Sequence, residues 1–117
     1  MNPYFTTAND ADGHTVVRFV TESLMNQSDI EAAGAALCRL AAGPGPHRLV
    51  LDLALVRHLS SQAIGILVRL NKQVGTVPGS TLVLCGVYPP LTDLLRITRL
   101  DKVFVVRPTR DAALRAR

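Results

Sequence analysis

Two adjacent serines, Ser60 and Ser61, stand where an apolar segment gives way to a helical pattern, in the stretch LVRHLSSQAIGILVRL. A serine hydroxyl just before a helix accepts a hydrogen bond from a free backbone N–H of the first turn, which is enough to explain a serine there. The same hydroxyl at an accessible helix start is also a place where a phosphate can be added and read by a partner. From the residues alone, capping is the leading interpretation for both serines.

The other reactive side chains do not form a recognisable catalytic or metal site. His58 lies too close to Ser60 along the chain for a catalytic triad, and no G-x-S-x-G sequence surrounds either serine. The three histidines lie far apart and have no spaced partners. Cys38 and Cys85 fall in periodic apolar segments, so we expect both to be buried free thiols. We therefore expect no enzyme, no metal ion and no cofactor.

Composition indicates one domain with an aliphatic core. The chain has 117 residues, 48% of them hydrophobic but only 4% aromatic, which suits helices packed on a sheet. The net charge is +4, but the basic residues are scattered, so we expect no nucleic-acid partner. No apolar run reaches the roughly 18 residues of a membrane helix, and the polar start does not look like a signal peptide. These features predict a cytoplasmic protein without a membrane partner.

Strands and helices alternate along most of the chain. Strand patterns precede and follow a turn at NDADG, which predicts an edge hairpin. The strands are expected at 3–8, 14–21, 48–56, 80–87 and 102–106. The helices are expected at 28–42, 61–74, 90–98 and after Thr109, which is the expected N-cap of the last. Ser28 and Glu31 have the spacing of a capping box for the first helix. This order predicts an α/β fold with a mainly parallel sheet.

Residues 48–56 form a near-continuous apolar run, typical of a strand covered on both faces, and Asp52 interrupts it. We interpret Asp52 as structural or solvent-facing, with a contribution to a partner surface as the lesser alternative. Ligands and partners of such sheets usually meet the carboxyl ends of the strands. The segment 57–62 follows one of these ends, so we expect Ser60 to lie exposed there.

The combination of LVLDLALV, LSSQAIGILVRLNKQV and LVLCGVYPPLTDLLRITRLDKVF resembles the STAS domain of bacterial anti-sigma factor antagonists. The resemblance covers nearly the whole chain and implies a single STAS domain over residues 1–117. It implies a four- to five-stranded, mostly parallel sheet with an N-terminal edge hairpin and about four helices.

The resemblance also implies a mechanism of partner switching. Regulated members bind a GHKL-type serine kinase that is also an anti-sigma factor, and this binding frees the sigma factor. Phosphorylation of a serine at the loop–helix junction ends the binding, and a PP2C-type phosphatase restores it. Two alternatives stay open for this chain: a STAS scaffold that is never phosphorylated, and a module that binds a small ligand such as a nucleotide or lipid.

The family junction usually reads Asp-Ser-Ser/Thr-Gly-Leu-Gly. On the resemblance, Ser60 takes the phosphorylated position and Ser61 is the second choice, while Leu59 replaces the Asp and Gln62 replaces the first Gly. The predicted partner surface is centred on this junction and consists of Leu59, Ser60, Ser61, Gln62, Asp52 and His58.

Overall fold

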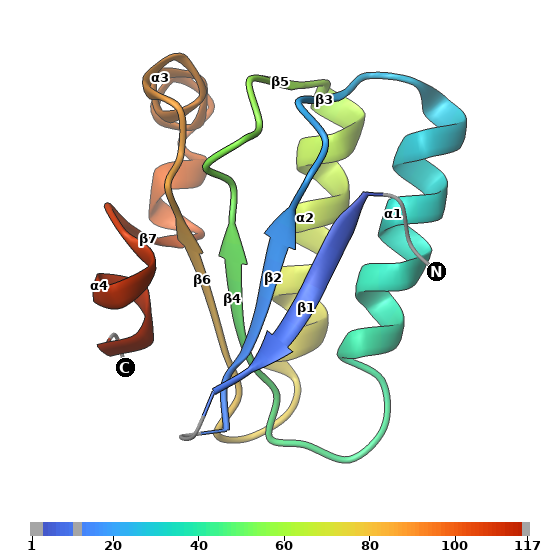
Figure 1. Cartoon of the computed structure of the whole chain (residues 1–117), viewed down its shortest axis with the longest axis vertical. Coiled ribbons are helices and arrows are strands. Elements are labelled where there is room, and N and C mark those ends of the chain that lie inside the picture. Colours follow the sequence, from blue (N-terminus) through green and yellow to red (C-terminus); the bar gives the residue numbers. More distant parts are fainter. Residues whose placement is uncertain (1–3, 11–12, 116–117) are drawn as a thin grey trace.

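The computed structural model describes residues 4–10 and 13–115. Five strands form one sheet in the order β1-β2-β4-β6-β7 (Figure 1). β1 pairs antiparallel with β2, and the remaining neighbours pair in parallel. The strands are β1 (Phe5–Asn9), β2 (Thr15–Phe19), β4 (Arg48–Asp52), β6 (Thr81–Cys85) and β7 (Val105–Arg107). The predicted α/β fold, with an edge hairpin on a mostly parallel sheet, is confirmed.

The helices lie on both faces and at one edge of this sheet. α1 and α2 run side by side across one face and share its apolar core, whereas the short α4 contacts β4, β6 and β7 from the opposite face (Figure 1). α3 follows β6 and lies near the carboxyl edge of the sheet (Figure 1). The helices are α1 (Gln27–Leu40), α2 (Ser61–Gly75), α3 (Pro89–Ile97) and α4 (Arg110–Arg115), with a 3₁₀ turn at Leu100–Lys102.

The apolar run in β4 is explained by helices on both of its faces. Leu51 is fully buried in the cluster beneath α1 and α2. Its neighbour Val50 points to the other face, where it packs with Val16, Val83 and Ala113 of α4. Because successive side chains of a strand alternate between faces, a strand covered on both sides must be apolar throughout.

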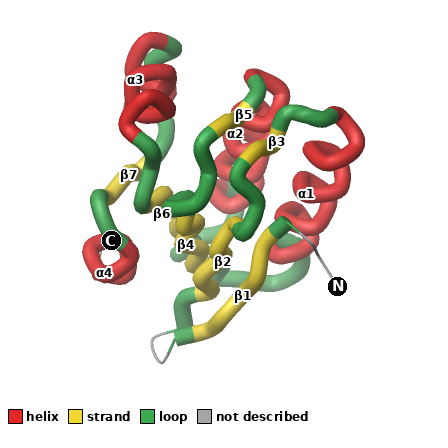
Figure 2. Tube along the Cα trace, turned by 45° about the horizontal axis from the view of Figure 1, so that its top comes forward, coloured by secondary structure: helices red, strands yellow, loops and turns green. Residues whose placement is uncertain are grey.

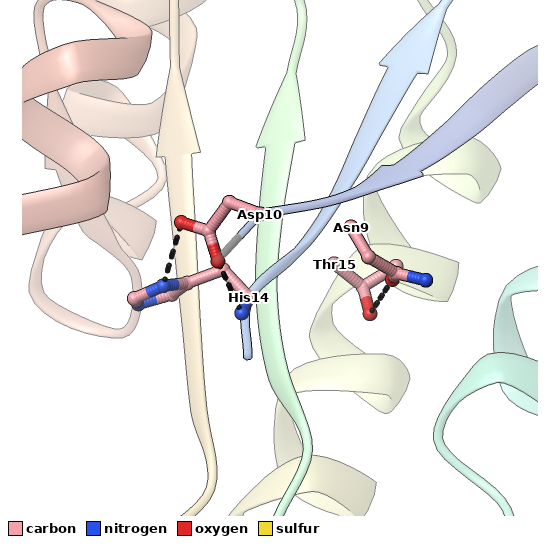
Figure 3. A network of polar contacts seen from close by, with 4 residues as sticks. All are labelled: Asn9, Asp10, His14 and Thr15. Carbon is pink, nitrogen blue, oxygen red and sulfur yellow. Dashed lines mark hydrogen bonds and ion pairs between the residues drawn. The ribbon is translucent and has the colours of Figure 1, made fainter. Parts of the chain in front are cut away.

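Polar contacts between described residues connect the end of β1 with the start of β2 (Figure 3). Asp10 accepts a hydrogen bond from the backbone N–H of His14 at 2.7 Å, and its second oxygen lies 3.1 Å from the His14 ring. The Thr15 hydroxyl donates to the Asn9 side chain at 3.1 Å. These bonds fix the register of the edge hairpin.

Several local predictions were wrong. α1 begins after Asn26, whose side chain accepts from the N–H groups of Ser28 and Asp29, so Ser28 lies inside the helix and forms no capping box. The last strand was predicted at 102–106 but lies at Val105–Arg107, and a 3₁₀ turn at Leu100–Lys102 precedes it. Cys38 is half-buried rather than in the core, whereas Cys85 is fully buried, and both are free thiols.

Candidate functional site: the serine junction

The junction between β4 and α2 lies at the carboxyl edge of the sheet and is held by a small second sheet. β3 (Ser23–Leu24) pairs in parallel with β5 (His58–Leu59), and the two strands lie side by side above the main sheet (Figure 2). The backbone carbonyl of Glu22 accepts from the N–H groups of Arg57 and His58, at 2.8 and 3.1 Å. This pairing fixes the path of the chain just before α2 begins.

Ser60 is the N-cap of α2. Its backbone is extended, with φ −75° and ψ 164°, and its hydroxyl accepts from the Ala63 N–H at 3.1 Å. Its own N–H donates to the Leu24 carbonyl at 3.1 Å. The side chain is half-buried, so the expectation of an exposed Ser60 was wrong. The hydroxyl is already used to satisfy one of the free N–H groups of the helix start.

Ser61, the first residue of α2, is exposed, and Gln62 beside it is exposed as well. Within the part of the chain that the structure describes, the Ser61 hydroxyl has no hydrogen-bond partner. The first turn of α2 contains no acidic residue, so the positive end of its helix dipole is not offset locally. Ser61 is therefore the more exposed of the two serines of the junction.

The two residues before the cap point in different directions, as expected of a strand. His58 is exposed, whereas Leu59 is half-buried and packs against the core. Leu59 therefore contributes to the junction mainly by anchoring β5 to the core, and His58 presents the accessible side chain of this strand.

Asp52 ends β4 and is only 8% exposed. Its carboxylate accepts from the Ala54 N–H at 3.0 Å and forms an ion pair with Arg110 of α4 at 2.8 Å. Both oxygens of the Asp52 carboxylate therefore have partners within the chain. Burial is the larger cause, and the nearby negative charge of Asp52 the smaller, that together raise the pKa of the Cys85 thiol from 9.0 to about 11.

Two groups near the junction were missed by sequence reasoning. The Arg57 guanidinium lies over the Tyr88 ring, 4.5 Å from its centre, and so connects the loop before β5 with the start of α3.

Two large apolar side chains near the junction are also exposed. Met25 directly follows β3 and is 58% exposed, and Leu55 is 43% exposed in the loop after β4. No local sequence pattern shows that such apolar side chains stay uncovered, because only the tertiary structure decides what packs on them.

The whole arrangement agrees with one family model. The model of the STAS domain matches residues 7–113. The chain belongs to the STAS domain family. The predicted family is thereby confirmed, together with the architecture that it implies.

Relatives of this STAS domain are named as anti-sigma factor antagonists. A Bordetella bronchiseptica protein named as an anti-sigma factor antagonist, BtrV, is 30% identical over 95 residues, which cover 81% of this chain and 80% of that protein. The structure of an anti-sigma factor antagonist from Mycobacterium paratuberculosis is 30% identical, with a TM-score of 0.74 and coverage of 97% and 94%. A STAS protein from Planctomyces limnophilus is 26% identical, with a TM-score of 0.82 and coverage of 94% and 93%.

Among residues 4–10 and 13–115, no group of three or more His, Cys, Asp or Glu residues is placed to hold a metal ion. Over the same residues, no helix combines the length and apolar character needed to span a bilayer.

Proposed function

We propose that this STAS domain is an anti-sigma factor antagonist that acts by binding, and that its partner is a GHKL-type serine kinase serving as the anti-sigma factor. The observation that carries the proposal is the serine junction, where an exposed hydroxyl stands at the start of α2 on the carboxyl edge of the sheet. The exposed side chains of Met25 and Leu55 near this edge suit a protein partner, because apolar groups that stay uncovered in a monomer gain most from burial in an interface.

Ser61 is the better-placed phosphate acceptor of the two serines. Its hydroxyl is exposed and free of partners in the described structure, whereas that of Ser60 caps the helix. The Ser60 cap also favours an alignment with the family motif Asp-Ser-Ser/Thr-Gly-Leu-Gly that is shifted by one residue from the one given above. With Ser60 in the place of the capping Asp, Ser61 takes the place of the first family serine, and Ile64 and Gly65 match the final Leu-Gly. Gln62 then occupies the place of the second hydroxyl residue.

A phosphate on Ser61 would act mainly on the interface. It adds nearly two negative charges beside the free N–H groups of the first turn of α2, where the helix dipole stabilises an anion. The fold therefore tolerates the phosphate, whereas a partner that fits closely over the unmodified junction is repelled or displaced. Removal of the phosphate by a PP2C-type phosphatase would restore binding.

The test compares the two serines as matched variants. The protein is purified from its native host and the phosphorylated position is read by mass spectrometry, for the wild type, Ser61→Ala and Ser60→Ala. We expect phosphate on Ser61, its loss in Ser61→Ala and its retention in Ser60→Ala. Ser60→Ala should instead lower the free energy of unfolding by about 1 kcal/mol through the lost cap, while Ser61→Ala leaves it nearly unchanged.

Binding to the candidate kinase completes the test. Ser61→Asp should weaken binding in a pull-down or calorimetric titration and leave the melting temperature unchanged. Phosphate found only on Ser60 would overturn the choice of Ser61. If neither serine is phosphorylated beside the kinase and Ser61→Asp binds normally, the switch is refuted and an unregulated scaffold is supported. A rise in melting temperature on adding a nucleotide or a lipid head group would favour the ligand-binding alternative.

A further inference from the structure

An open groove runs between α1 and α2 on the face of the molecule that these helices form. Its volume is about 490 Å³. Both helices start at the carboxyl edge of the sheet and run the same way (Figure 1). Glu31 and Gln62 therefore lie toward one end of the groove, and Cys38 and Arg69 lie further along it.

The middle of the groove is lined by the small residues Gly34, Ala35 and Gly65 together with Ile66, and packing within the chain explains only part of this pattern. A Cβ atom on Gly34 would lie 2.9 Å from the Ile66 side chain, so the close approach of α1 and α2 requires that glycine. A Cβ on Gly65 would meet nothing within 4 Å. Glycine is a poor helix former, and no contact within the described structure requires it at Gly65. A second molecule approaching α2 closely would explain it.

The two charged residues that line the groove, Glu31 and Arg69, have opposite signs and lie toward opposite ends of it. Glu31 accepts a hydrogen bond only from Gln27, and Arg69 has no hydrogen-bond or ion-pair partner among the described residues. We propose that the groove is a self-association surface, on which a second copy of the chain packs end over end. This orientation places the Arg69 end of each groove over the Glu31 end of the other.

A second copy fits these observations better than an unrelated helix. A twofold arrangement uses the same surface on both partners, so the surface must be complementary to itself. A groove with one acid toward one end, one base toward the other and small residues between them meets this condition. An unrelated partner would need matching charges of its own, whereas a second copy of the chain supplies them through Glu31 and Arg69. Ser61 does not line the groove, although its neighbour Gln62 does. Self-association and phosphorylation of Ser61 are measured separately, so the failure of one is distinguishable from the failure of the other.

The experiment measures self-association of the full chain by sedimentation velocity from about 10 µM to 1 mM, the range expected of a small interface. We expect a monomer–dimer equilibrium in the wild type. Arg69→Glu and Glu31→Arg should each weaken it about tenfold or more, because like charges then face each other. The double variant Glu31→Arg/Arg69→Glu should restore association, since it exchanges the two charges. Arg39→Glu is the matched control for Arg69→Glu, because it changes the net charge by the same amount at an exposed position of α1 that does not line the groove. It should have little effect on association.

Two further measurements address the contact itself. Gly65→Gln should abolish association without lowering the melting temperature, because the added side chain enters open space in the monomer. Labelling of Cys38, which lines the groove, should slow as protein concentration rises, with the buried Cys85 as internal reference. The inference is overturned if the protein stays monomeric throughout, if Arg39→Glu weakens association as much as Arg69→Glu, or if the double variant fails to restore it.

Discussion

Replacing Arg110 with glutamine should detach α4 from the sheet and destabilise the protein. α4 is six residues long and packs on its face of the sheet through Ala113 and the half-buried Leu114. The Asp52–Arg110 ion pair, at 2.8 Å, fastens its first turn to the end of β4. Without the guanidinium, the Asp52 carboxylate stays buried with the Ala54 N–H as its remaining hydrogen-bond donor.

The magnitude lies between that of a surface pair and that of a fully buried pair. Removing one partner of a buried pair costs about 3–5 kcal/mol, whereas exposed pairs contribute about 0.2–1 kcal/mol. The side chain of Asp52 is 11% exposed and that of Arg110 is 42% exposed, so solvent screens the pair from one side. We therefore expect a loss of about 2 kcal/mol in the free energy of unfolding. For a chain of this length, that corresponds to a fall of about 8 °C in melting temperature.

Two assays check this prediction against a matched control. Arg115→Gln removes the same charge from the exposed end of α4 and should change stability by less than about 0.5 kcal/mol. Cys85 lies beneath α4, so native-state thiol labelling should speed up by as much as about 30-fold in Arg110→Gln. Loss of the Arg110 charge alone would have the opposite effect, because that charge lowers the pKa of Cys85. Equal melting temperatures for the two variants, or unchanged Cys85 labelling, would show that the ion pair does not hold α4.

Three predictions concern the α1 cap and the cysteines. Asn26→Ala should cost about 1 kcal/mol of stability in a urea melt, whereas Ser28→Ala should cost little, and the reverse result would support the capping box instead. At pH 8, a thiol reagent should modify half-buried Cys38 well before Cys85. Folding raises the pKa of Cys85 from 9.0 to about 11, so the thiol loses its proton at a lower pH in the unfolded chain than in the folded one. The ionisation of Cys85 should therefore lower the free energy of unfolding as pH rises from 9 to 11. A Cys85→Ala variant should lack this part of the pH dependence.

The elements that sequence predicted well are those whose signal lies within one segment. The apolar run of β4 and the spacing of Ala63, Leu67, Leu70 and Val74 on α2 each reflect burial within the core. The structure buries residues 49–53 of that run and all four of the α2 residues. Such patterns extend over many residues, so a local error in one position does not change the interpretation.

The features that sequence missed depend on partners far along the chain. β3 and β5 have two residues each, and their pairing joins segments that begin at residues 23 and 58. The Asp52–Arg110 pair spans 58 positions. The capping box failed for another reason: Asn26 and Ser28 are both good caps, and the bonds that the first turn forms decide between them.

A similar choice between two neighbouring residues, Ser60 and Ser61, matters for function at the serine junction. A phosphate on Ser60 would be attached to the oxygen that accepts from the Ala63 N–H, inside a half-buried turn. Modification there would change the fold and the interface together. A phosphate on Ser61 leaves that bond intact and meets only the exposed start of the helix. A reversible switch requires two states of similar stability that differ in what they bind. We propose that Ser61 meets this requirement, with Ser60 holding the helix start in place for both states.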